Sequence, residues 1–283
     1  MFTDGPVTPA RLECLIDLLR EHSRREWNRA SVTAVLQPQG LPDLSPTSQQ
    51  AGETLTAAVD LGLITQDGGQ IKLASAEREA TTRELLLGCL ENRVLASTNI
   101  EPYYAPFYSY LTSLGRNGAE KKDRVTWAND FNRDCPQMAG TQNPFNAVKH
   151  VGLERWYVYS GHGWFDPEGV FQPNPYWRVL RQLPRIFGKE TKLPGDDFIM
   201  KIADCCPELD HGAIFRRTCP TYNLEARVAT LALSHALVDL HLDEHIRLYC
   251  APDSRGWSIE GSQPPNDGKT LRSGRIDYVE FCN

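Results

Sequence analysis

The sequence predicts a mainly helical α+β fold in which helices lead into short β-hairpins. Apolar residues recur at helical spacing near the start of the chain, at Leu12, Leu15, Ile16 and Leu19. A polar helical pattern at residues 48–60 passes through Leu61-Gly62-Leu63 into a strand, turn and strand that end at Leu73. A similar passage from helix to hairpin occurs near residues 143–165 and again near 223–259. We therefore expect three diverged copies of one architecture.

The composition is that of a globular chain. The 283 residues are enough for two or three domains. Hydrophobic residues make up 41% and charged residues 23%, which excludes a disordered chain. Neither a signal peptide nor an apolar stretch long enough for a bilayer is present in the sequence, so we expect a cytoplasmic protein that does not enter a membrane. The eight cysteines are expected to be reduced thiols.

The first predicted unit covers residues 1–75. Thr8 and Pro9 are an expected N-cap and first helical residue. A short helix is expected at residues 28–36, and a third at 48–60 with Leu55, Ala58 and Val59 on its inner face. The hairpin that ends at residue 73 completes this unit, and a helical linker is predicted at 76–119.

Two further units are predicted after the linker. The second unit, residues 120–192, has a helix at 143–153 and an aromatic hairpin with strands at 156–159 and 164–165. The third unit and a C-terminal tail occupy residues 193–283. Its long helix is expected from Asn223 to Leu240, and its hairpin has strands at 246–250 and 257–259 around a turn at 253–256. Residues 275–281 alternate like a final strand.

Basic residues provide the candidate DNA contacts. The formal net charge is −6, so a DNA-binding protein of this composition has to concentrate its cations locally. Residues 48–60 contain no Lys or Arg and carry Glu53 and Asp60, which favours a surface that faces protein over one that reads bases. The predicted DNA-binding residues lie elsewhere: Arg24, Arg25 and Arg29 in the first unit, and Arg116, Lys121, Lys122, Arg124, Lys149 and His162 in or before the second.

Metal and catalytic sites have weaker support. His235, His241 and His245 lie close in sequence to Cys250, but the paired ligands typical of structural zinc are missing, so no metal or cofactor is predicted and the zinc alternative stays open. The sequence contains no phosphate-binding Gly-Lys loop, no Gly-x-Ser-x-Gly elbow and no His-Glu-x-x-His motif. These observations favour a non-enzymatic protein.

Two resemblances follow from these residues. The helix and hairpin at residues 48–73 and the aromatic segment 156–165 resemble the winged helix-turn-helix superfamily. That superfamily includes transcription factors and tandem subunits of condensin-like complexes, which bind partner proteins. The Cys-Pro-Glu-Leu-Asp-His-Gly run at 206–212 and the Phe-Gln-Pro-Asn-Pro run at 171–175 are similar to accessory proteins of bacterial phage-defence islands, including those that insert deazaguanine bases into DNA.

The resemblances imply tandem winged-helix units, three in number, joined by the helical linker. We expect a non-enzymatic accessory protein of a prokaryotic DNA-handling or antiviral defence complex that binds double-stranded DNA. The alternative is a protein–protein interaction subunit, a tandem winged-helix adaptor that does not touch DNA. Its apolar helix at 231–240 would then contact other subunits of the complex. A homo-oligomer is a further expected form of the chain.

Overall fold

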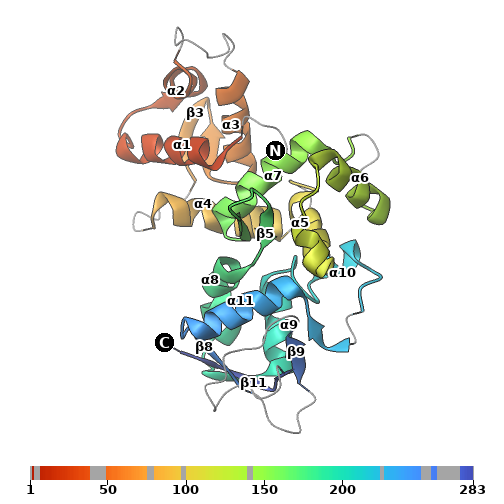
Figure 1. The fold of residues 1–283 in the computed structure, drawn as a ribbon. Coiled ribbons are helices and arrows are strands. Elements are labelled where there is room, and N and C mark those ends of the chain that lie inside the picture. Colours follow the sequence, from red (N-terminus) through yellow and green to blue (C-terminus); the bar gives the residue numbers. More distant parts are fainter. Residues whose placement is uncertain are drawn as a thin grey trace. The chain divides into compact units, whose positions relative to one another are not determined.

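The computed structural model describes residues 2, 7–38, 49–74, 80–96, 100–138, 143–223, 226–249, 256–259 and 275–282. Within these ranges the chain is mainly helical and carries small sheets (Figure 1), which confirms the α+β class. No helix in these ranges is long and apolar enough to cross a membrane. The turn expected at 253–256 lies outside the described residues except for its last residue.

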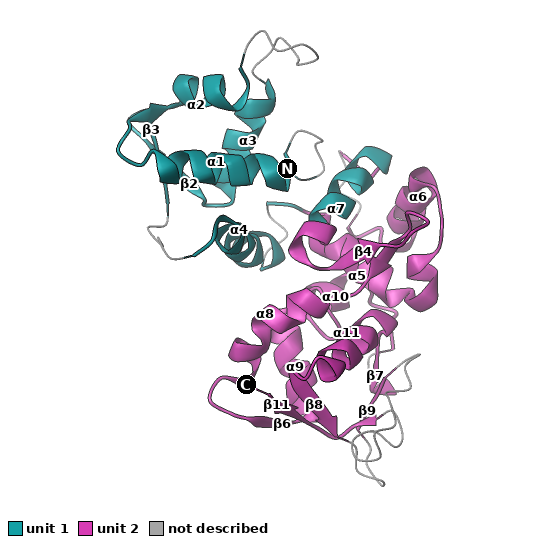
Figure 2. Ribbon diagram, turned by 60° about the vertical axis from the view of Figure 1, so that its left-hand side comes forward, with its two compact units in different colours: residues 1–101, 147–156 teal, residues 102–146, 157–283 magenta. Residues whose placement is uncertain are grey.

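The chain divides into two compact units, which Figure 2 shows in different colours. Unit 1 consists of residues 1–101 and 147–156, and unit 2 of residues 102–146 and 157–283. These units cut across the boundaries predicted from the sequence, because one helix, α7 (Ala147–Ser160), contributes to both.

Unit 1 contains the helices that the sequence predicts. They are α1 (Pro9–Glu21), α2 (Arg29–Leu36), α3 (Gln49–Asp60) and α4 (Thr82–Leu90), which continues into the π-helical turn η1 (Glu91–Leu95). Thr8 caps α1 and Asn28 caps α2, each through its side chain, as such residues do at helix starts. The expected apolar face of α1 is buried. On α3, Leu55 and Ala58 are buried as expected, but Val59 is 42% exposed.

A three-stranded antiparallel sheet completes this part of unit 1. Its strands are β1 (Trp27–Asn28), β2 (Ile64–Asp67) and β3 (Gln70–Leu73), in the order β1-β3-β2. The β2–β3 hairpin confirms the one expected at residues 64–73. Its turn places Gly68 and Gly69 at positive φ, the conformation that glycine adopts without strain. The element order is therefore helix, strand, helix, helix, strand, strand.

Unit 2 contains most of the remaining helices. They are α5 (Tyr104–Ser113), the 3-10 turn η2 (Gly115–Ala119), α6 (Arg124–Asp134), the last turn of α7, α8 (Tyr176–Phe187), α9 (Gly195–Cys205), α10 (Ala213–Thr218) and α11 (Leu231–Leu242). The long helix starts at Leu231 under a Thr230 cap, and not at Asn223 as predicted. Aromatic side chains of α5 and α6 form much of the core, with ring contacts that join Phe107, Phe131 and Phe145.

Unit 2 also holds three small sheets. The hairpin pairs β4 (Gly163–Phe165) with β5 (Phe171–Pro173). A second sheet has the order β6-β11-β8, from β6 (Lys192–Pro194), β11 (Tyr278–Phe281) and β8 (Ile246–Tyr249). The third has the order β10-β9-β7, from β10 (Arg275–Ile276), β9 (Trp257–Ile259) and β7 (Val228–Ala229).

The order of elements in unit 1 occurs a second time in unit 2. The elements α8, β6, α9, α11, β8 and β11 again run helix, strand, helix, helix, strand, strand, with α10 and β7 inserted before α11 and β9 and β10 inserted between β8 and β11. In each sheet the last strand of the set lies between the other two, as β1-β3-β2 and as β6-β11-β8. The second set begins at Tyr176, inside the region that the sequence assigned to the second predicted unit.

The prediction of an aromatic hairpin at residues 156–165 is wrong. Residues 156–159 belong to α7, which continues to Ser160. The chain leaves this helix at Gly161, where φ is +76°, and the hairpin starts only at Gly163. Its second strand is Phe171–Pro173, after a turn in which the Asp166 carboxylate accepts hydrogen bonds from the backbone N–H groups of Glu168 and Val170.

The third expected hairpin is also wrong. The strands at 246–249 and 257–259 exist, but they belong to different sheets. β8 pairs with β11. The single final strand expected at 275–281 is divided at Asp277 into β10 and β11, which belong to different sheets. β9 pairs with β10 on one side and with β7, in parallel, on the other.

Two glycines offer a matched test of this packing. A Cβ on Gly118 would lie 2.0 Å from the Leu111 carbonyl oxygen, whereas a Cβ on Gly88 in α4 would meet no atom within 4 Å. We expect Gly118→Ala to lower the free energy of unfolding by about 1–3 kcal/mol through overpacking. Gly88→Ala should raise it by up to about 1 kcal/mol through helix propensity. Urea denaturation followed by circular dichroism measures both, and a neutral Gly118→Ala variant would contradict the close approach of η2 to α5.

Candidate functional site

The three arginines predicted to bind DNA in the first unit lie after α1 and at the first residue of α2, and all three are exposed. Arg24 and Arg25 follow α1, and the Arg25 guanidinium lies 4.3 Å from the centre of the Trp27 ring. Arg29 is the first residue of α2 and donates from Nη2 to the Gly52 carbonyl oxygen of α3 at 3.3 Å. These contacts hold two of the three cations beside the start of α2. The N-terminus of a helix adds its own partial positive charge there.

The basic loop at residues 116–124 belongs to unit 2. Arg116, Lys121 and Arg124 are exposed. Lys122 is engaged within the protein: its Nζ lies 3.7 Å from Asp130 Oδ2, 3.8 Å from Glu120 Oε2 and 4.5 Å from the centre of the Trp127 ring. Carboxylates of the same region therefore offset part of the positive charge expected from the sequence.

Two of the predicted DNA-binding residues are buried. His162 was expected at a hairpin tip, but it is fully buried, and Lys149 is only 4% exposed. The expectation that these two side chains lie on the surface is wrong. A phosphate cannot approach either of them in this conformation.

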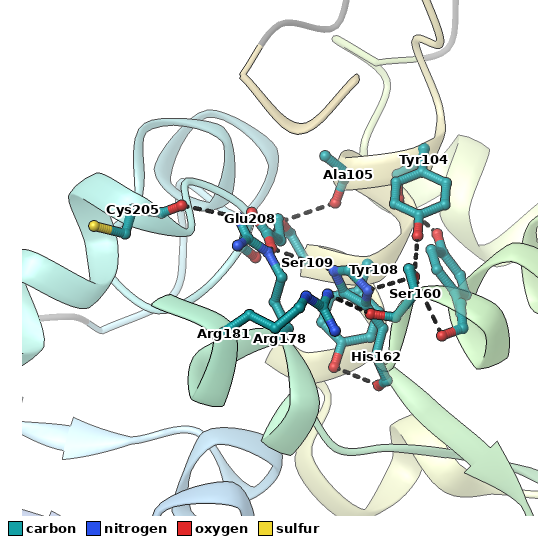
Figure 3. A network of polar contacts seen from close by, with 11 residues as sticks. Tyr104, Ala105, Tyr108, Ser109, Ser160, His162, Arg178, Arg181, Cys205 and Glu208 are labelled. Carbon is teal, nitrogen blue, oxygen red and sulfur yellow. Dashed lines mark hydrogen bonds and ion pairs between the residues drawn. The ribbon is translucent and has the colours of Figure 1, made fainter. Parts of the chain in front are cut away.

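His162 instead lies within a buried polar network of unit 2 (Figure 3). Its Nδ1 is 2.7 Å from Ser160 Oγ, and its Nε2 is 3.3 Å from Glu208 Oε1. The same carboxylate oxygen accepts from Arg178 Nε at 2.8 Å. Ser160 Oγ also contacts the Tyr104 hydroxyl. The network thus joins α5, the end of α7, α8 and the loop after α9.

Further hydrogen bonds fix the elements around this network. Arg178 Nη2 donates to the Cys205 carbonyl oxygen at 2.8 Å, and Arg181 Nη2 donates to the Ser160 carbonyl oxygen at 2.7 Å. The Tyr108 hydroxyl donates to the His162 carbonyl oxygen at 2.7 Å, and Ser109 Oγ donates to that of Glu208 at 2.8 Å. Each side chain therefore satisfies backbone groups where helices end, as buried polar groups must.

Electrostatics set the protonation of the network. Burial alone would raise the pKa of Glu208, but the Arg178 charge and the His162 hydrogen bond outweigh it and lower this pKa to about 2. Burial also lowers the pKa of His162, although Glu208 opposes that shift. A neutral His162 that donates from Nε2 to the carboxylate accepts at Nδ1 from the Ser160 hydroxyl, which leaves Ser160 to accept from Tyr104. The hydrogen bonds then run in one direction, from Tyr104 to Ser160, from Ser160 to His162 and from His162 to Glu208.

Ser160, His162 and Glu208 are connected by hydrogen bonds in the same series, hydroxyl to imidazole to carboxylate, as in a hydrolase triad. All three side chains are fully buried, so a substrate has no access to Ser160 Oγ in this conformation. In this conformation the three side chains connect α5, the end of α7, α8 and the loop at 206–212 within unit 2. Among the described residues, no group of three or more His, Cys, Asp or Glu side chains could hold a metal ion.

The loop at residues 206–212 supplies a second buried carboxylate. Asp210 accepts from the Thr230 backbone N–H at 2.6 Å and from Thr230 Oγ1 at 2.8 Å, while Thr230 caps α11. Gly212 is required for a close approach, because a Cβ there would lie 2.3 Å from the Pro207 carbonyl oxygen. This short run thus connects α8 through Glu208 and α11 through Asp210.

The sequence pointed to this run only through a family resemblance. Glu208 and Asp210 are two acidic residues among apolar ones in a short loop. Such a pattern indicates that the carboxylates are buried with partners, but it does not identify the partner residues. No motif in the sequence assigns a role to Arg178. Its partner, Glu208, is 30 residues away, and nothing in the local pattern connects the two.

Comparison with known families agrees with the resemblance to defence islands. A family model described as DpdG-like matches residues 3–254. The chain belongs to the DpdG-like family. Membership of this family links the chain to deazaguanine DNA-modification islands and fits a DNA-modification and defence context. No curated protein and no solved structure shows significant similarity to the chain.

The buried ion pair provides a test of whether the polar network stabilises unit 2. Glu208→Gln removes the buried carboxylate that pairs with Arg178, so we expect the free energy of unfolding to fall by about 3–5 kcal/mol. Glu190→Gln is the matched control, because Glu190 is exposed and its pair with Lys201 contributes little. Urea titrations at neutral pH measure both variants, and equal stabilities would contradict the role of Glu208.

The same pair predicts acid sensitivity. The pKa of Glu208 is lowered, so its contribution is complete above the ordinary value of 4.5 and is lost as the pH falls toward about 2. The lowered pKa of His162 adds a loss that begins below its ordinary value of 6.5, since the unfolded chain takes up that proton first. We expect the free energy of unfolding to decline from pH 6.5 downward, and Glu208→Gln to flatten the part below pH 4.5. A variant curve parallel to the native one would overturn this account.

Proposed function

We propose that this chain is a non-enzymatic, DNA-associated accessory protein of a prokaryotic DNA-modification or defence assembly, and that it contacts duplex DNA through winged-helix units. The observation that carries the proposal is the order of elements in unit 1. A helix, a short strand, two helices and a two-stranded hairpin, with the first strand added to that hairpin, is the arrangement of a winged helix. Its repetition from α8 to β11 supports a tandem of two such units in place of three.

The arginines near α2 support contact with the DNA backbone. In helix-turn-helix proteins the helix that precedes the reading helix crosses the backbone, and cations around it neutralise phosphates. Here α2 precedes α3, and Arg24, Arg25 and Arg29 are grouped at or before its first turn.

The surface of α3 argues against base-specific reading. Its exposed residues are Gln49, Thr56, Val59 and Asp60, none of which is a cation. Gln and Thr can meet base edges, but without cations on the same helix they are poorly held in a groove. We therefore propose binding that depends on the backbone and not on sequence.

The alternative is a protein–protein interaction subunit, and one observation in unit 2 limits where its interface can lie. Helix α11 takes the position of a reading helix in the second set of elements, yet six of its twelve residues are buried. Leu237 and Leu240, expected to form an interface with other subunits, are fully buried in the core. That expectation is wrong, and a partner of this unit would have to dock elsewhere.

Fluorescence anisotropy with a labelled duplex at low salt tests the DNA proposal. We expect measurable binding that weakens steeply as salt is added, because each neutralised phosphate contributes about 0.9 to the slope of log K against log salt. Changing Arg24, Arg25 and Arg29 together to Ala should weaken binding and reduce that slope by about 1 for each arginine that touches a phosphate.

The control changes Arg185, Lys189 and Arg216 to Ala. These three exposed cations lie in unit 2 and outside the predicted DNA-binding set, and the variant carries the same change in net charge. It should bind almost as tightly as the native chain. If both triple variants bound DNA with equally reduced affinity, or if the affinity did not depend on salt, the proposal that unit 1 binds DNA through these arginines would be contradicted.

The loop at 116–124 is tested separately. If unit 2 adds contacts, changing Arg116, Lys121 and Arg124 to Ala should lower the salt slope further, while Lys122→Ala changes little because Lys122 is already paired. A slope that stays unchanged in the triple variant would restrict DNA binding to unit 1.

A further inference from the structure

An exposed aromatic side chain near the start of α8 is connected through Tyr176 to carboxylates near the end of α11. Trp177, the second residue of α8, is 60% exposed, and Leu242, the last residue of α11, is 52% exposed. The two helices pack against each other within unit 2 (Figure 1). Asp239, Asp243 and Glu244 lie on or just after α11. We call these five residues the acidic anchor surface.

Trp177 is held rigidly although its ring is exposed. A Cβ on Gly161 would lie 2.4 Å from Trp177 Cβ, so the base of the indole packs directly on the Gly161 backbone. The ring of the preceding residue, Tyr176, meets it edge to face, with the ring centres 5.1 Å apart. The Tyr176 hydroxyl in turn donates to Asp243 Oδ2 at 2.6 Å. A fixed, exposed aromatic ring binds at little entropic cost, which is typical of interface hot spots.

The charge of this surface selects the kind of partner. Asp239 accepts a hydrogen bond from Asn174 Nδ2 at 2.9 Å, and Asp243 accepts from Tyr176. Neither of them, nor Glu244, forms an ion pair with any Lys or Arg in the described parts of the chain. Beside Trp177, the Arg181 guanidinium lies at Gly161 and donates to the Ser160 carbonyl oxygen. The three carboxylates have no ion-pair partner among the described Lys and Arg residues, so they attract basic groups and repel phosphates. Trp177 is therefore poorly suited to stack on a nucleic-acid base.

We infer that the acidic anchor surface docks a basic segment of a partner protein. An aliphatic or aromatic side chain of that segment packs on Trp177 and Leu242, and flanking Lys or Arg residues pair with Asp239, Asp243 and Glu244. This inference does not depend on DNA binding, because the arginines of the DNA proposal lie in unit 1 and in the loop at 116–124.

Selection from a phage-displayed library of random 12-residue peptides on the full chain tests the inference. We expect enriched peptides that combine an aromatic or aliphatic residue with two or more Lys or Arg. An enriched peptide, synthesised and labelled, should lose affinity about tenfold or more on Trp177→Ala. The double change Asp243→Asn with Glu244→Gln should also weaken it, and more at low salt than at high salt.

The control variant changes Asp197 and Asp204 of α9 to Asn. Both residues are exposed, and the variant has the same net charge as the double variant of the acidic anchor surface. It should bind the peptide like the native chain, and thermal unfolding checks that every variant is folded.

Several outcomes would overturn the inference. They are acidic or uncharged peptides in the enriched set, no enrichment at all, or equal loss of affinity in the α9 control. Binding of single-stranded DNA that is lost on Trp177→Ala would assign the surface to nucleic acid instead. Self-association of the chain that is lost on the same change would assign it to a second copy.

Discussion

The structure of unit 2 depends on the buried ion pair between Glu208 and Arg178. A buried carboxylate is costly unless cations and donors surround it, and here Arg178 and His162 both point at one oxygen. Each of these groups also satisfies, or is fixed by, backbone carbonyls at the ends of helices. Removing one member takes a buried hydrogen bond from its neighbours. The network therefore holds α5, the last turn of α7, α8 and the loop at 206–212 in one arrangement within unit 2.

Much of unit 1 could be predicted because its signals are local. Thr8, Pro9 and Asn28 mark helix starts through contacts within a few residues. The Asp67-Gly68-Gly69 turn fixes the register of the β2–β3 hairpin, since its glycines take the positive φ that the turn requires. The arginines near α2 were visible for the same reason. Their grouping follows from a single short connection and not from distant parts of the chain.

Helix α7 shows why other parts could not be predicted. Val148, Val151 and Val158 are exposed on it, whereas Lys149 and His150 are buried. In a typical amphipathic helix the apolar residues are buried and the charged ones exposed, and here the reverse holds. The sequence of α7 therefore shows no helical period of apolar residues, and its aromatic and β-branched residues at 156–159 favour the prediction of a strand. The sheet β6-β11-β8 was missed because its strands come together from positions far apart in the chain, and hydrophobic alternation within a strand does not identify its partner.

The position of β11 also affects how the chain folds during synthesis. β11 is the central strand of its sheet and pairs with both β6 and β8. The sheet of unit 1 needs only residues up to Leu73, so it can form early on the ribosome. The edges of β6 and β8 that pair with β11 in the folded sheet stay uncovered until residue 281 emerges. During that interval they are open to chaperones or to wrong pairing, and slower translation near the end of the chain would prolong it.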